Sequence, residues 1–178
     1  MSGDAKPYRF AWKDLGDIEV GRPNLGNIMN VSIYRLMQYT LRDVLDRRYS
    51  PETAAGILRE AGYVAGREFC RNMLDCSLPF EGFVSLLQEK LQALGIGILR
   101  MEETDAENMV FVMTLAEDLD CSGLPVSGVT VCEYDEGFIA GLLELYTGKE
   151  FNVREIDCWS TGERTCRFRA VAQDWEQV

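Results

Sequence analysis

Apolar residues recur every three or four positions through the first half of the chain, which is the spacing of amphipathic helices. Three helices are expected, over residues 31–48, 50–74 and 78–95. Ser50 followed by Pro51 is a typical helix start, because the serine caps the first turn and proline loses nothing there. Gly95 is expected to end the third helix. Residues 14–27 are rich in glycine and are expected to be irregular.

After Gly95 the apolar positions alternate, which favours β-strands. Strands are expected at 96–101 and 109–115 around an acidic turn, at 126–131, and in a final hairpin at 151–159 and 165–171. A fourth helix is expected over 135–146, closed by Gly148 and pressed against the sheet through Gly137 and Gly141. Helices packed on one antiparallel sheet make an α+β fold. Without a linker or repeat, we expect a single domain over residues 1–178.

Composition narrows the function. The chain has 178 residues, 47% of them hydrophobic, with 18 basic and 29 acidic side chains and a net charge of −11. This charge disfavours nucleic acid and anionic membranes as partners. The chain has no histidine, which excludes Ser-His-Asp and Cys-His catalysis and imidazole metal ligands. With no apolar run of about 18 residues and no signal-peptide pattern, we expect no membrane span and a cytoplasmic location.

Cysteines supply the candidate chemistry. Cys158 and Cys166 are equidistant from Gly162, so a hairpin centred there would place them opposite one another. A bulge near residues 154–156 would turn Glu155 toward the same point. Cys132 precedes the fourth helix, whose free N–H groups stabilise a thiolate.

Three sulfurs and one oxygen suit a tetrahedral zinc ion, and four protein ligands would make that site structural. The residues alone also allow buried free cysteines, or a disulfide between Cys158 and Cys166. Three cysteines fall outside the pattern: Cys70 is expected to be buried, and Cys76 and Cys121 to be more exposed in loops.

The run from Cys132 through Gly137-Phe138, with Glu155-x-x-Cys158 and Cys166-x-Phe168 downstream, resembles the 4-vinyl reductase domain family. This family includes the sensory domain of phenol- and xylene-responsive activators. The resemblance implies that zinc is bound by Cys132, Glu155, Cys158 and Cys166, within a zinc-binding part at 126–172. It also implies a fold similar to TRAPP tethering subunits and NO-signalling ligand-binding domains, and a homodimer. Residues 31–48 are the candidate dimer face.

Relatives of this kind hold small apolar or aromatic molecules between helices and sheet. The resemblance points to Phe80, Phe83 and Phe111 as ligand-binding residues, with plain core packing as the alternative. Because the phenol sensors use a histidine that this chain lacks, a more apolar ligand is expected.

The expected function is a stand-alone, zinc-stapled sensor or carrier of a hydrophobic small molecule that acts through a separate effector protein. The alternatives are an accessory or reductase factor in vinyl reduction of chlorophyll-type tetrapyrroles, and a structural assembly subunit. No catalytic residue is assigned, because the sequence has neither a dinucleotide fingerprint nor a P-loop.

Overall fold

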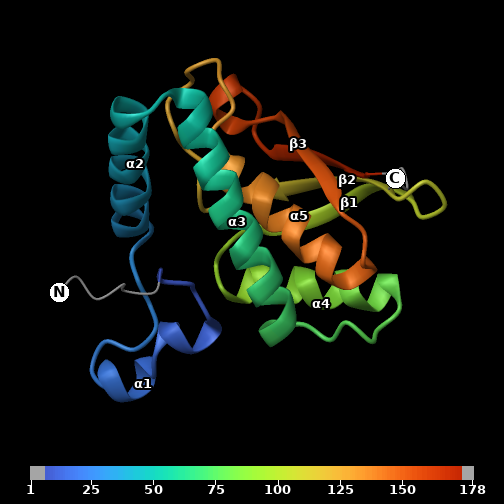
Figure 1. Ribbon diagram of the computed structural model, residues 1–178, viewed down its shortest axis with the longest axis horizontal. Coiled ribbons are helices and arrows are strands. Elements are labelled where there is room, and N and C mark those ends of the chain that lie inside the picture. The colour runs from blue at the N-terminus through green and yellow to red at the C-terminus, as the bar shows by residue number, and fades with distance from the viewer. Residues whose placement is uncertain (1–6, 174–178) are drawn as a thin grey trace.

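Helices pack on one four-stranded sheet in the computed structural model, which describes residues 7–173 (Figure 1). Its elements, in chain order, are η1 (Trp12–Leu15), α1 (Ile18–Gly21), α2 (Val31–Arg48), α3 (Pro51–Met73), α4 (Phe80–Ala93), β1 (Ile98–Asp105), β2 (Val110–Ala116), α5 (Glu133–Thr147), β3 (Phe151–Asp157), η2 (Trp159–Thr161) and β4 (Cys166–Ala172). The strands are antiparallel in the order β1-β2-β4-β3. The predicted α+β class is confirmed. None of the helices described is both long and apolar enough to cross a membrane.

Local capping sets the helix ends where the sequence predicts them. The Ser50 hydroxyl accepts a hydrogen bond from the N–H of Thr53 at 3.2 Å at the start of α3. Gly148 ends α5 in the left-handed conformation that glycine adopts at low cost. Gly95 has a positive φ just beyond α4. These ends fix the directions in which α3, α4 and α5 run.

The prediction that α5 presses on the sheet through its glycines is wrong, because both glycines face α3. A Cβ on Gly137 would overlap the carbonyl oxygen of Arg59, and one on Gly141 would overlap that of Tyr63. Gly62 and Gly66 of α3 approach α5 just as closely. Four glycines therefore bring the two helix backbones together, while α5 also contacts β3 and β4 (Figure 1).

Two expected loops and strands differ in the structure. β1 continues to Asp105 through a register shift between Met101 and Glu103, so the acidic segment is largely strand. Residues 126–131 form no strand. Instead, the N–H groups of Ser127 and Gly128 both donate to the carbonyl of Ser160 at 2.9 Å, and this loop lies against η2. Residues 14–27 also include short helical turns.

Helix α2 packs on the molecule through polar side chains. Tyr34 and Gln38 donate hydrogen bonds to the carboxylate of Asp120, at 2.8 and 2.7 Å. Arg35 donates to the backbone carbonyls of Asp118, Leu119 and Ser122. The helix buries no residue fully, and its apolar side chains face outward. We call these the α2 stripe: Ile33, Leu36, Met37, Leu41 and Val44, all more than a third exposed.

Candidate metal centre and adjoining cavity

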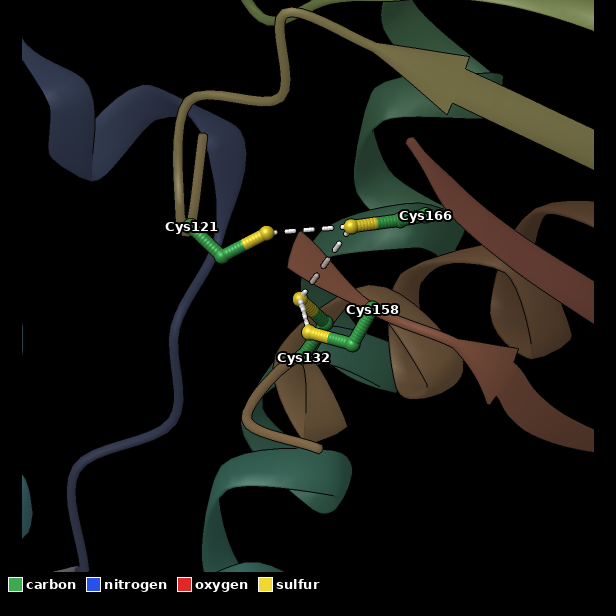
Figure 2. Close-up of side chains that lie close together, drawn as sticks. All are labelled: Cys121, Cys132, Cys158 and Cys166. Atoms are coloured by element: carbon green, nitrogen blue, oxygen red, sulfur yellow. Dashed lines mark hydrogen bonds between the residues drawn. The ribbon is translucent and has the colours of Figure 1, made fainter. Parts of the chain in front are cut away.

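Four cysteines from distant parts of the chain come together at one end of the sheet (Figure 2). Their Sγ atoms all lie within 4.8 Å of one another, and all four residues are buried. The members of this Cys cluster are Cys121, Cys132, Cys158 and Cys166. They come from the loop after β2, the N-cap of α5, the end of β3 and the start of β4. The cluster therefore joins a loop, a helix and two strands.

The sulfur separations suit one small cation. Cys132 Sγ lies 3.9 Å from Cys158 Sγ and 3.8 Å from Cys166 Sγ, and Cys121 Sγ lies 3.0 Å from Cys166 Sγ. A tetrahedral zinc ion with Zn–S bonds of about 2.3 Å needs sulfurs about 3.8 Å apart. All six cysteines are free in the structure, so the disulfide alternative is not formed in it.

The expected hairpin pairing of Cys158 with Cys166 is wrong in detail. Cys166 is paired with Leu115 of β2, whereas Cys158 lies just beyond β3 and caps η2. The predicted bulge is confirmed, as the register of β3 and β4 shifts between Glu155 and Asp157. The two sulfurs meet because η2 turns the chain back, not because they face each other across a ladder.

Cys121 is the residue that sequence reasoning missed. The sequence predicts it in an exposed loop, but it is fully buried. Its thiol lies 3.3 Å from the carboxylate of Asp118, which also accepts from Cys166 at 3.2 Å and Cys132 at 3.5 Å. The one signal in the sequence is its short distance from Cys132. No spacing rule links it to Glu155-x-x-Cys158.

Glu155 lies beside the Cys cluster. Its Oε2 accepts a hydrogen bond from the backbone N–H of Cys132 at 3.3 Å, while its Oε1 is buried without a hydrogen-bond partner. Burial, and then the nearby Cys158, raises the pKa of Glu155 to about 8. The buried Glu136 holds this segment in place by accepting the N–H of Glu155 at 2.8 Å. A lone buried carboxylate oxygen next to thiols is what a cation would satisfy.

The thiols cannot all be ionised without a positive charge among them. Hydrogen bonds with the other three cysteines, and then burial, raise the pKa of Cys132. Hydrogen bonds from the same neighbours lower the pKa of Cys158. One sulfur therefore carries charge at the expense of the others. A divalent cation would remove this conflict by favouring the thiolate at every position.

The aromatic residues predicted to bind ligand pack on one another. Phe80 stacks on Phe111 with ring centroids 5.1 Å apart, and Phe83 stacks on Tyr146 at 3.9 Å. Phe83 and Phe111 are only 1% and 2% exposed. None of the three predicted residues lines either cavity described next, and their role in binding stays a prediction.

Two cavities meet at the start of α5. An apolar cavity of about 40 Å³ lies between α4, α5 and the sheet. A wider one of about 1140 Å³ lies between the N-terminal segment, α3 and α5; we call it the outer cavity. Ile96, Asp135 and Phe138 line both. The outer cavity also reaches Leu119 and Asp120, which precede Cys121 in the loop that contributes to the Cys cluster.

Comparison with known proteins places the second half of the chain. Residues 111–172 match the family model of the vinyl-4-reductase domain. An uncharacterized protein of Methanocaldococcus jannaschii is 27% identical over 91% of this chain and 88% of its own length. The residues matched by the family model span Glu155 and all members of the Cys cluster.

The fold is shared with solved structures of low sequence identity. The phenol-responsive sensory domain of the transcription activator PoxR, solved with phenol, has a TM-score of 0.60 and 16% identity, covering 84% of this chain and 78% of that one. Trafficking protein particle complex subunit 3 from Naegleria fowleri, covalently bound to palmitic acid, has a TM-score of 0.64 and 11% identity, with coverage of 84% and 98%. These likenesses confirm the predicted fold.

Proposed function

Since residues 111–172 of this chain belong to the vinyl-4-reductase domain family, we propose that the protein is a small-molecule-binding module, a sensor or carrier, fastened by one structural zinc ion. The Cys cluster carries this proposal. Four buried sulfurs at near-tetrahedral spacing would fill the coordination of zinc and leave no position for substrate. The ion would then tie the start of α5 to β3 and β4 within a single domain.

We propose that Cys132, Cys158 and Cys166 are ligands and that Cys121 supplies the fourth sulfur. The spacing of the Cys cluster supports this set. Glu155, the fourth ligand expected from the sequence, has its own support in the unpartnered Oε1. It remains the competing assignment, because the carboxylate also accepts the N–H of Cys132.

A pair of variants separates the two assignments. Cys121→Ser is expected to weaken zinc binding at least tenfold, since it removes a sulfur ligand. Glu155→Gln is expected to retain one zinc per chain, because the amide oxygen can still accept the Cys132 N–H. Zinc content by native mass spectrometry, with chelator competition for affinity, makes the measurement. Zinc lost from Glu155→Gln and kept by Cys121→Ser would restore Glu155 as the fourth ligand.

The ligand site is supported by the outer cavity and by the fold shared with the PoxR sensory domain, which was solved with phenol. Its wall is mostly aromatic and aliphatic, as in most small-molecule sites. Protein purified under gentle conditions is expected to show, in native mass spectrometry, either a retained organic molecule or saturable uptake of small aromatic compounds. A chain that takes up none of them, with zinc bound, would contradict the binding function. The effector would be a separate protein.

We also propose a homodimer formed through the α2 stripe. The stripe has the symmetry that self-association requires: about a midpoint between Gln38 and Tyr39, Ile33 mirrors Val44 and Leu36 mirrors Leu41. Two copies of α2 packed antiparallel about a twofold axis would thus present the same apolar face to each other. Large apolar patches on soluble proteins mark such interfaces.

A charge exchange tests both the surface and its orientation. Antiparallel pairing places Ile33 next to Val44 of the second copy, so Ile33→Glu or Val44→Lys alone is expected to give monomers at about 10 µM, because each buries an unpaired charge. The double variant is expected to regain the dimer, since each glutamate then meets a lysine. The control is Val126→Glu, an exposed apolar residue away from α2. Light scattering after size exclusion gives the mass, and monomeric wild type would refute the proposal.

A further inference from the structure

The outer cavity has a polar feature that its apolar wall does not require. Asp135 lines it, and the Oδ2 of this side chain is buried with no hydrogen-bond partner. Asp120 lines the same cavity, but its carboxylate already accepts from Tyr34 and Gln38. A buried carboxylate oxygen without a donor is costly. Asp135 is therefore placed to receive a donor from a molecule in the cavity.

The charges around Asp135 select the sign of that donor. Glu60, Asp120 and Asp135 line the outer cavity, and Arg9 is the one basic side chain among the described lining residues. The carboxylate of Asp118 lies within 4.8 Å of that of Asp135. This excess of acidic groups in a partly dry cavity attracts a cation and repels an anion.

The rest of the wall would hold an apolar body. Trp12 from η1, Val64 from α3 and Phe138 from α5 border the cavity from three sides. Phe138 and Ile96 also border the small apolar cavity behind it. A ligand whose positive end lies at Asp135 could thus extend an aromatic or aliphatic group over these side chains, as amphiphilic ligands do in mixed sites.

We propose that the outer cavity binds a small organic amine, with its ammonium group at Asp135 and its apolar body against Trp12 and Phe138. This inference rests on the proposed binding function and specifies its ligand class. It differs from the expectation of a wholly apolar ligand, because no pattern along the chain places Asp135 in a cavity.

Three naphthalene probes that differ mainly in charge test the proposal: 2-naphthylmethylamine, 2-naphthylmethanol and 2-naphthoate. Titration calorimetry on the zinc-loaded protein at pH 7 is expected to show the amine binding about tenfold more tightly than the alcohol, as one charge-assisted hydrogen bond allows, and the carboxylate binding most weakly. Asp135→Asn is expected to remove the amine's advantage and leave the alcohol within about twofold, in keeping with the same single bond. Glu103→Gln, an exposed acid on β1, is the matched control and should change nothing.

Val64→Trp provides a second variant that leaves Asp135 intact. The larger side chain would fill the outer cavity, so all binding of the amine is expected to be lost. Equal affinity for amine and alcohol in the wild type would overturn the amine assignment while leaving the binding function in place. Amine binding that survives Val64→Trp unchanged would also overturn it. If no probe binds at all, the inference fails, and retention of an organic molecule in native mass spectrometry then decides the binding function separately.

Discussion

Cys158→Ser is expected to lose zinc and to lower the free energy of unfolding by about 4 kcal/mol, a size typical of losing a structural metal. Cys158 lies where β3 ends and η2 begins, and its sulfur is fully buried beside those of Cys132 and Cys166. Without the ion, the remaining thiols would have to stay protonated in a dry site, and the loop carrying Cys121 would lose its link to β4. Urea unfolding and zinc content together give the measurement.

A strong chelator separates the metal's contribution from the side chain's. It is expected to reduce the stability of the wild type to about that of Cys158→Ser and to leave the variant unchanged. Cys76→Ser is the matched control: Cys76 is exposed, and its sulfur pairs only with Cys70 at 3.3 Å, outside the Cys cluster. If Cys158→Ser keeps one zinc and the wild-type stability, the structural-metal proposal fails.

The sequence predicted best what short-range chemistry decides. The ends of α2, α3 and α5 follow from capping residues and glycines within a few positions, so their predicted limits lie close to those observed. The register shift near Glu155 was readable because apolar parity changes there. Three of the four members of the Cys cluster also lie in motifs with regular spacing.

Long-range contacts decided what the sequence could not show. Cys121 joins the cluster because its loop folds back over the start of β4, and no local pattern marks that return. Residues 126–131 are β-prone but irregular, since their N–H groups are taken by Ser160, which lies in η2. The outer cavity likewise depends on how the N-terminal segment crosses α3 and α5.

Gly137→Ala is expected to destabilise the protein by about 3 kcal/mol, the upper range for overpacking a tight site. A methyl group there would overlap the backbone carbonyl of Arg59, and backbone cannot move aside as a flexible side chain can. Helix α5 would have to separate from α3, and its first turn carries Cys132 and Asp135. Both zinc affinity and binding in the outer cavity should therefore weaken along with stability.

Gly56→Ala is the control that isolates the close approach from helix propensity. Gly56 belongs to α3, and a Cβ there would meet nothing within 4 Å. Because alanine favours helices more than glycine does, this variant is expected to be more stable than the wild type by about 0.5–1 kcal/mol. Urea unfolding of both variants should thus give shifts of opposite sign. Equal shifts would mean that the glycines at the contact between α3 and α5 act through propensity alone, and that the two backbones need not touch.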